Sequence, residues 1–459
     1  MGFKVIVIGG GLSGLGLAHC FSKAGIDYVV LERNDDVCIA DGASMAMWPH
    51  NARILDQLGL LKGAEALDYN IKMKINVRKD GSVIGRSNMM EAIGQRLGHN
   101  WMCFHRPQLI QLLYDELPER ETRMLPNKAL ETIETTADGV RVVCKDGSEY
   151  EGSIVVGADG VNSAVRRHLA TQLNDAKLAE PFTTSYRGLF GWSTLPEGIK
   201  LHHLYEMHGD KVTVQVIPGQ DKAMFLVYER LPAPSKTSVR YTDEDKEAFA
   251  AKYADFHVAE SVRFGDIWAQ AQWSFCSGLE EGLAEKWYGD RIVLIGDTVH
   301  KMTPNIGLGL NSGWQSAAIL TNCLRKVLLR NLAPNTAELR DAFKEYQAIR
   351  KKDASDMVDV SGLYTRVVAW NNPVWKFVDQ YLTNPIGGDC KLLDLLMVPM
   401  VRKGNTLDFL TENNYRTGTT AWLKGQTVVE KDAALALAPT TSVTPVAVAP
   451  AAPAVEQAA

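Results

Sequence analysis

Lys4-Val5-Ile6-Val7-Ile8-Gly9-Gly10-Gly11-Leu12-Ser13-Gly14 is the stretch that decides the fold. Its apolar run is typical of a parallel strand covered on both faces, and the glycines turn the chain into a helix expected to run to about Lys23. Gly9, Gly11 and Gly14 stand in the order G-x-G-x-x-G. In this pattern the glycines allow a tight turn, the approach of a pyrophosphate and close helix packing. The helix N-terminus would then offer N–H groups and a partial positive charge to that anion.

A second strand strengthens this interpretation. Residues 28–31 are apolar, and Glu32 follows them at about the spacing expected for a carboxylate that binds a ribose hydroxyl. The combination predicts a dinucleotide site, and the alternative is a βαβ unit without a ligand.

Size and composition narrow the class of protein. A chain of 459 residues is long enough for two domains and a tail. The net charge of −5 argues against nucleic acid as a partner. The seven cysteines are scattered without a CxxC pair, which argues against a disulfide framework, a zinc site or a redox dithiol. We therefore expect an intracellular protein, either cytoplasmic or peripherally associated with an internal membrane.

The residues between about 367 and 401 leave two alternatives open. They contain Trp370, Trp375, Phe377 and Tyr381, followed by an apolar run at 392–398. Such a segment is able to lie on a membrane surface or to line the entrance for a greasy substrate. The alternative is a set of ordinary amphipathic helices packed on the domain. No continuous apolar run reaches the length of a bilayer-spanning helix.

An antiparallel sheet is expected to interrupt the βαβ pattern. Val212, Val214 and Val216 alternate with Thr213 and Gln215, and the chain turns at residues 218–219 before returning over 223–228. One face of this sheet would be packed and the other wet or ligand-facing. Aromatic residues are frequent here, which suits an apolar pocket, although many aromatics are simply core.

The chain then returns to the first fold. Residues 290–295 predict another buried parallel strand, which ends in Gly296-Asp297. A glycine-rich loop over 304–311 leads into a long helix expected to continue through Leu320. Asp297, at the carboxyl end of a strand, is placed either to bind ligand hydroxyls or to cap a helix.

Three glycine-acid elements now stand in a fixed order: the N-terminal fingerprint, Asp159-Gly160 and Gly296-Asp297. In this the sequence resembles the class A FAD-dependent monooxygenases, the para-hydroxybenzoate hydroxylase-like enzymes, over about residues 1–365. The segments 105–109, 185–187 and 296–304 look closest to the fungal paxilline-type monooxygenases. Thr298 stands where those enzymes usually carry alanine.

The resemblance implies an α/β fold in which a Rossmann-like βαβ FAD-binding domain carries an inserted antiparallel substrate sheet and C-terminal helices. We expect the FAD-binding domain at 1–70, 100–180 and 286–365, and the substrate domain at 71–99 and 181–285. A C-terminal helical region would follow at 366–427. From about 428 the sequence is mostly Ala, Pro, Val and Thr, which predicts a disordered tail over 428–459.

The resemblance also implies the chemistry. FAD would be reduced by NADPH, or NADH, which would visit and leave because the sequence has only one dinucleotide fingerprint. Oxygen would then add to the flavin C4a, and the resulting hydroperoxide would pass one oxygen atom to a hydrophobic small molecule. The leading expectation is epoxidation of a prenyl-derived alkene in fungal terpenoid, meroterpenoid or indole-diterpene biosynthesis. The alternatives are an aromatic hydroxylase and a flavin-dependent isoprenoid dehydrogenase or reductase that works without oxygen.

Site residues follow from motif position and from the resemblance. Arg187, with Tyr186 beside it, is the candidate donor to the peroxide, against the alternative of an arginine that binds loop carbonyls. Asp159 is expected to support both nucleotides, Arg106 to reach the FAD phosphates, and residues 307–311 to face the flavin pyrimidine edge. No metal is expected, since His202, His203 and His208 do not form a ligand set. The predicted cofactor residues are Gly9, Gly11, Gly14, Glu32, Gly42, Ala43, Arg106, Asp159, Asp297, Gly307, Gly309 and Asn311.

Overall fold

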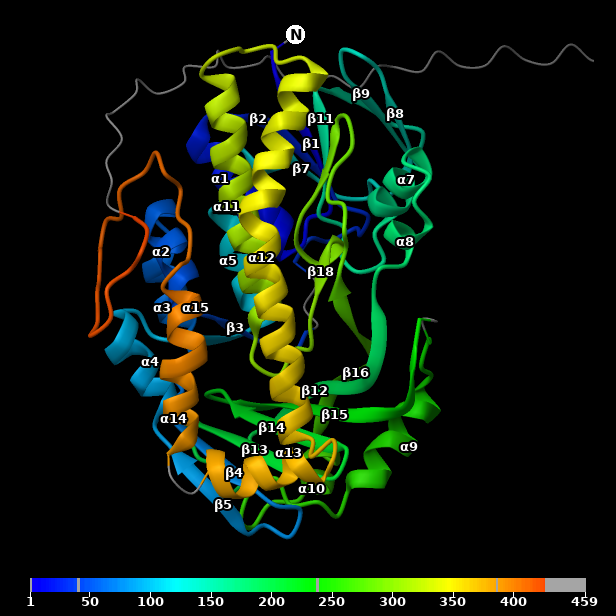
Figure 1. Ribbon diagram of the computed structural model, residues 1–459. Coiled ribbons are helices and arrows are strands. Elements are labelled where there is room, and N and C mark those ends of the chain that lie inside the picture. The colour runs from blue at the N-terminus through cyan, green and yellow to red at the C-terminus, as the bar shows by residue number, and fades with distance from the viewer. Residues whose placement is uncertain (1, 39–41, 237–238, 385–386, 426–459) are drawn as a thin grey trace, which may run out of the picture.

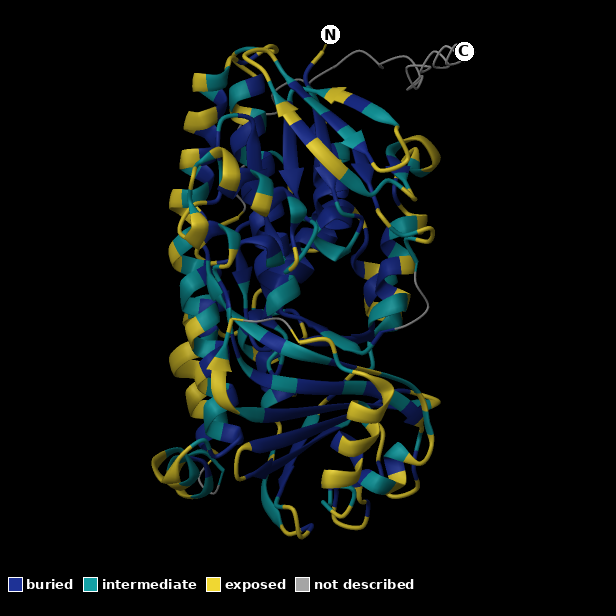
Figure 2. Ribbon diagram, turned by 90° about the vertical axis from the view of Figure 1, so that its right-hand side faces the viewer, coloured by how far each residue is buried: buried dark blue, intermediate teal, exposed yellow. Residues whose placement is uncertain are grey.

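The computed structural model describes residues 2–38, 42–236, 239–384 and 387–425. The tail predicted from residue 428 lies outside these ranges. Two sheets dominate the molecule, and they lie at opposite ends of it (Figure 1). Buried residues are concentrated in both sheets, whereas the outer faces of the helices are exposed (Figure 2).

The first sheet is parallel and carries the N-terminal fingerprint. Its apolar strands are buried on both faces, as the continuous runs of Val and Ile predict. Helices α1 (Leu12–Ala24), α5 (Arg106–Asp115) and α11 (Leu308–Leu328) belong to this half of the molecule. The strands, in spatial order, are β17 (Ile292–Leu294), β11 (Ile154–Gly157), β1 (Lys4–Ile8), β2 (Asp27–Leu31) and β7 (Met124–Leu125).

Smaller elements complete this half. A two-stranded sheet pairs β3 (Ser44–Met47) with β6 (Met102–His105). A three-stranded antiparallel sheet holds β8 (Leu130–Thr135), β9 (Val140–Cys144) and β10 (Glu149–Gly152). The short helices are α2 (Pro49–Leu58), α3 (Leu61–Leu67), α6 (Arg120–Arg123), α7 (Ala164–Gln172) and α8 (Ala176–Ala179).

The second sheet is the predicted antiparallel insertion, and it has eight strands. All neighbours are antiparallel except β13 and β4, which run parallel. In spatial order the strands are β18 (His300–Lys301), β16 (Ala271–Leu283), β12 (Thr183–Thr194), β15 (Lys222–Ser235), β14 (Val212–Pro218), β13 (His203–Gly209), β4 (Met73–Val77) and β5 (Val83–Ser87). The sheet thus recruits β18 from the segment expected to belong to the FAD-binding domain.

The two faces of this sheet have different covers. On one face, Val214 and Phe225 pack with α9 (Asp243–Tyr253) and α10 (Phe264–Trp268). On the other face, Tyr228 belongs to a cluster that includes Ala46 of β3, Leu308 of α11 and residues of α4 (Met89–Leu97). We call this second side the inner face, because it is turned toward the parallel sheet.

Helix α12 (Thr336–Val368) connects both halves. It begins with a capping box in which Asn335 accepts hydrogen bonds from the N–H groups of Ala337 and Glu338. The helix runs along the whole molecule, from the parallel-sheet end to the eight-stranded sheet (Figure 1). It therefore continues past residue 365, where the FAD-binding domain was expected to end.

Within the described residues up to 425, the C-terminal region is helical only to Val401, so its helices end earlier than the predicted range of 366–427. Residues 402–425 instead form a non-helical strap that returns to α2, where Arg53 pairs with Glu412. Among the described residues, no helix combines the length and the apolar character needed to cross a membrane. The helical segments are α13 (Pro373–Phe377), η2 (Val378–Thr383), α14 (Gly388–Leu392), η3 (Leu393–Met397) and α15 (Val398–Val401), of which η2 and η3 are π-helical.

Candidate functional site

The fingerprint glycines form a cradle at the carboxyl end of β1. Gly9 has a φ of +108°, and a Cβ there would lie 2.6 Å from the carbonyl oxygen of Ala158. A Cβ on Gly14 would fall 1.9 Å from the Gly9 carbonyl oxygen, so both positions require glycine. At Gly11, by contrast, a Cβ would meet nothing within 4 Å. The N-terminus of α1 therefore faces open space that is able to accept an anion.

Glu32 lies beside this cradle. Its Oε2 accepts a hydrogen bond from the Gly10 N–H at 2.7 Å, and its Oε1 accepts one from the Asn34 N–H at 2.9 Å. The carboxylate is thus fixed at the end of β2, as a ribose-binding group would require.

Asp297 lies at the end of β17, in a short 3₁₀ turn. Its carboxylate is partly exposed and pairs with Lys301. A Cβ on Gly309 would lie 3.9 Å from Asp297 Oδ1, so the carboxylate faces the first turn of α11. Gly307 caps that helix at a φ of +66°, where a side chain would also strike Ala46.

Arg106 joins these two regions. Its backbone N–H donates to the Ala43 carbonyl at 3.0 Å, and its side chain packs on Gly42. Burial lowers the pKa of Arg106, whereas the carboxylates of Asp297 and Glu32 raise it. One guanidinium is therefore within electrostatic reach of both acids, which come from opposite ends of the sequence.

These features fit FAD. A glycine cradle, a helix N-terminus and a fixed carboxylate suit the adenosine diphosphate half, and a second acid with a second helix N-terminus suits the flavin half. A family described as an FAD binding domain matches residues 2–361. The chain belongs to this family.

Relatives of this flavoprotein are monooxygenases. It is 36% identical to the FAD-dependent monooxygenase srdH of Neurospora crassa, over 92% of this chain and 99% of that protein. It is 31% identical to the FAD-dependent monooxygenase ausM of Penicillium brasilianum, over 83% of this chain and 82% of that protein. The predicted class, a flavin monooxygenase with FAD as cofactor and NAD(P)H as reductant, is confirmed.

Solved structures confirm the fold. The uric acid and FAD complex of HpxO from Klebsiella pneumoniae has a TM-score of 0.70 at 20% identity, covering 87% of this chain and 96% of that one. A salicylate hydroxylase substrate complex has a TM-score of 0.65 at 17% identity, covering 85% of this chain and 93% of that one. The predicted Rossmann-like domain with a separate antiparallel sheet is therefore correct.

Two of the predicted cofactor residues, Asp159 and Asn311, have side chains that are hydrogen-bonded to other groups of the protein. The Asp159 carboxylate accepts hydrogen bonds from Ser163 Oγ and from the Ala164 and Val165 N–H groups, so it caps α7. The backbone of Asp159 lies against Gly9, however, and this contact shapes the cradle.

Asn311 is fully buried, and its side chain also makes hydrogen bonds to backbone groups of the protein. Its Oδ1 accepts from the Trp48 N–H, and its Nδ2 donates to the carbonyls of Ala46 and Gly307. The side chain therefore ties β3 to the first turn of α11, so the predicted contact of residues 307–311 with the flavin would come from their backbone N–H groups.

Arg187 lies on the wrong face of the substrate sheet for the predicted catalytic role. Its Nε donates to Glu229 at 2.6 Å, and its guanidinium stacks 4.3 Å from the ring centre of Phe249 in α9. Because strand residues alternate between faces, the neighbouring Tyr186 is on the inner face. The Tyr186 hydroxyl donates to Asn371 at 3.3 Å. The two residues predicted to act together are thus on opposite sides of β12.

Apart from Tyr186, the residues that the inner face presents were not among the predicted site residues. Trp192 shares the face of Tyr186, lies 6.3 Å from the ring of His105, and has a buried Nε1 without a partner among the described residues. Gln215 and Tyr228 are joined by a hydrogen bond of 3.0 Å. The alternation of Val212–Val216 with Thr213 and Gln215 already predicted two different faces. Only the three-dimensional structure shows which of these two faces is turned toward the parallel-sheet half.

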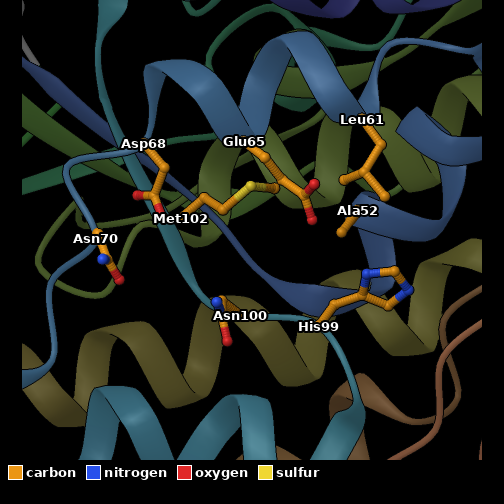
Figure 3. Close-up of a pocket in the computed structure, with 8 residues that line it drawn as sticks. All are labelled: Ala52, Leu61, Glu65, Asp68, Asn70, His99, Asn100 and Met102. Atoms are coloured by element: carbon orange, nitrogen blue, oxygen red, sulfur yellow. The ribbon is translucent and has the colours of Figure 1, made fainter.

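A second hollow lies apart from the dinucleotide cradle. It is a polar cavity of about 300 Å³, and it contains none of the predicted site residues (Figure 3). His99 is 2% exposed, and burial lowers its pKa to about 4, so its ring is neutral there. The lining residues are Ala52, Leu61, Glu65, Asp68, Asn70, His99, Asn100 and Met102.

Proposed function

We propose that FAD lies along the carboxyl ends of the parallel strands, with its pyrophosphate at Gly9–Gly14 and its adenosine ribose on Glu32. Arg106 and Asp297 would hold the pyrophosphate and the ribityl chain, and the first turn of α11 would face the flavin pyrimidine edge. The observation that supports this placement is that the two halves of the site meet: Gly296, beside Asp297, lies against Ser13 of α1, where a Cβ on Gly296 would be 2.6 Å from Ser13 Oγ. Reduced FAD supplies the activation of dioxygen, and the chain binds, orients and shields the reactants.

We propose that the acceptor is an apolar molecule, and that the reaction is epoxidation of a prenyl-derived alkene in fungal secondary metabolism. The inner face of the substrate sheet supports this proposal, because Phe190, Met224 and Leu226 belong to its apolar cluster. NADPH is the proposed reductant.

Aromatic hydroxylation is the second candidate. It is supported by the names of fold neighbours, which include a salicylate hydroxylase and a 2,6-dihydroxypyridine-3-hydroxylase. One experiment distinguishes epoxidation from aromatic hydroxylation. The purified holoenzyme is given NADPH and labelled dioxygen together with a panel of prenylated alkenes and of phenols, and the products are analysed for the label. Label in an epoxide supports the proposal, and label only in a phenol contradicts it. Substrate conversion without oxygen would instead indicate a dehydrogenase or reductase.

Trp192 replaces Arg187 as our proposed hydrogen-bond donor toward the reacting oxygen. The indole N–H lies on the inner face, where Lys222 Nζ is 4.6 Å from the centre of the Trp192 ring, and it is buried without an acceptor among the described residues. A buried donor without a partner is costly, so a bound reactant that accepts from it would be favoured.

We also propose that the C-terminal helices contact a membrane surface. Val374, Phe377 and Tyr381 form an outward stripe at helical spacing and are 65%, 54% and 61% exposed. Leu395, 70% exposed, belongs to a second stripe with Leu392 and Leu396. The inner sides of the same helices are already packed, because Leu393, Val398 and Val401 belong to the inner-face cluster. Because the inner side is already packed, the exposed apolar side of these helices is free to contact a second apolar environment. The neighbouring rings of Phe377 and Tyr381 are of the kind that suits a bilayer interface.

A further inference from the structure

Four ionisable side chains form a buried network beneath the C-terminal helices. Glu206 is fully buried, and its Oε2 lies 2.6 Å from Lys74 Nζ and 3.1 Å from His208 Nε2. His208 Nδ1 lies 2.7 Å from Asp379 Oδ2. Lys74 is on β4, Glu206 and His208 are on β13, and Asp379 is in η2, so the network joins the substrate sheet to the C-terminal region.

Stability alone is a weak explanation for these charges. Burying an ion pair costs solvation energy, and apolar residues of similar volume often stabilise a core as well or better. The directed contacts that the charges make are therefore more informative than their number. Lys74 and His208 outweigh the effect of burial on Glu206 and hold its pKa well below the ordinary value, so the carboxylate is ionised.

Gln215 is the next residue along this network. Its Nε2 donates to Glu206 Oε1 at 2.7 Å and to the Asn305 carbonyl at 2.9 Å. Its Oε1 accepts from the Tyr228 hydroxyl at 3.0 Å. Turning the amide over would place Oε1 against a carboxylate and a carbonyl, which both repel it. The ionised Glu206 therefore permits one orientation of this side chain.

Asn305 lies in the turn that leads into α11. The Gly307 N–H closes this turn on the Pro304 carbonyl at 2.9 Å. Asn305 is held from two sides, because Gln215 binds its carbonyl and Thr365 of α12 donates to its Oδ1 at 2.7 Å. Both anchors belong to parts of the chain outside the parallel sheet.

We propose that Gln215 is a positioning residue for the flavin-facing end of α11, and that Glu206, held by Lys74 and His208, fixes the direction of its amide. The substrate sheet thereby sets the place of the helix dipole at the flavin. This inference rests on the flavin placement proposed above and is independent of the substrate.

The test compares flavin properties of the holoenzyme and its variants. Gln215→Leu removes the donor to Asn305, and we expect FAD to bind about tenfold more weakly, as the loss of one net hydrogen bond would give. We also expect a more negative flavin midpoint potential, because a displaced helix N-terminus stabilises the reduced anion less. FAD fluorescence titration and equilibrium with redox dyes measure the two quantities.

Thr213→Val is the matched control. Thr213 is two residues away on the same face of β14, and its hydroxyl donates to the Met207 carbonyl at 2.8 Å instead of to the turn. We expect this variant to lower the melting temperature without changing FAD affinity or potential. Glu206→Gln should shift both flavin properties in the same direction as Gln215→Leu, by a smaller amount.

Wild-type affinity and potential in a folded Gln215→Leu variant would overturn the inference. If Gln215→Leu does not fold, FAD affinity and midpoint potential are measured in Glu206→Gln and Thr365→Val instead. Wild-type values in both of these variants would overturn the inference. Asp297→Ala distinguishes a wrong flavin placement from a wrong role for Gln215. If Asp297→Ala weakens FAD binding and Gln215→Leu does not, only the inference fails. If neither does, the placement itself is wrong.

Discussion

Trp192 and Arg187, five residues apart on β12, show how the face of a strand changes a catalytic hypothesis. Arg187 is bound by Glu229 and Phe249 beneath α9, whereas the Trp192 N–H on the inner face has no partner in the part of the chain that the structure describes. A strand exposes alternate residues to opposite faces, so a prediction that is one position out selects the wrong side.

We expect Trp192→Phe to raise the fraction of NADPH-derived electrons lost as hydrogen peroxide, since phenylalanine keeps the ring but lacks the donor. Arg187→Ala should leave that fraction at the wild-type value and lower the free energy of unfolding by about 1 kcal/mol, because it removes a partly exposed ion pair and a stacked cation. Peroxide assays alongside NADPH oxidation check both variants. Raised peroxide in Arg187→Ala but not in Trp192→Phe would reinstate the original assignment.

His208 should make stability depend on pH. Burial lowers its pKa, but the carboxylates of Asp379 and Glu206 outweigh burial and raise it to about 9. The stabilisation is then complete below the ordinary pKa of 6.5 and is lost as the pH rises through 9, in total on the order of 3 kcal/mol. Denaturant unfolding between pH 6 and 10 measures this loss.

His208→Gln should flatten that part of the pH profile. His257→Gln is the control, because His257 is partly exposed and lies 3.3 Å from the Lys79 carbonyl. A profile that keeps its slope in His208→Gln would contradict the assignment.

At the scale of elements, the C-terminal helices carry a prediction about membranes. We expect the full chain to float with vesicles of phosphatidylcholine and phosphatidylserine, and a Phe377→Ser/Tyr381→Ser/Leu395→Ser variant to lose most of that binding, because each change removes exposed apolar area. Vesicle flotation measures the bound fraction.

The control for this experiment is Leu329→Ser/Leu332→Ser. These leucines are also exposed, at 43% and 57%, but they lie elsewhere, at the end of α11. Equal binding by all three proteins, or a wild-type protein that dimerises without vesicles, would contradict the membrane proposal.

At the scale of the whole molecule, the C-terminal strap closes over the parallel-sheet half. Arg53 and Glu412 are buried and paired, although they are far apart in sequence. Glu412→Ala should lower the free energy of unfolding by about 3–5 kcal/mol, because it leaves a buried guanidinium without its counter-ion.

Arg416→Ala is the matched comparison in the same strap. Arg416 pairs with Glu65 at the surface, where such pairs contribute about 0–1 kcal/mol. Calorimetry or denaturant unfolding of the two variants gives the difference. Equal losses would show that the strap is not anchored by the buried pair.

The sequence by itself determined the parallel half and its cofactor. The glycines of the fingerprint, Glu32 and Gly296-Asp297 are local signals, because each depends on backbone conformation or on the end of one buried strand. The family resemblance gave the flavin and the reaction class. Even the hairpins of the substrate sheet followed from residue alternation and turn residues.

Only the tertiary structure decided which residues meet across the two halves. The side chains of Asp159 and Asn311 proved to bind backbone groups of the protein, since a polar side chain near a site is satisfied by whichever partner lies closest. The faces of β12, the anchoring of Asn305 by Gln215 and the return of residues 402–425 depend on contacts between distant segments. No local periodicity encodes such contacts, because they arise from how the sheets and α12 pack together.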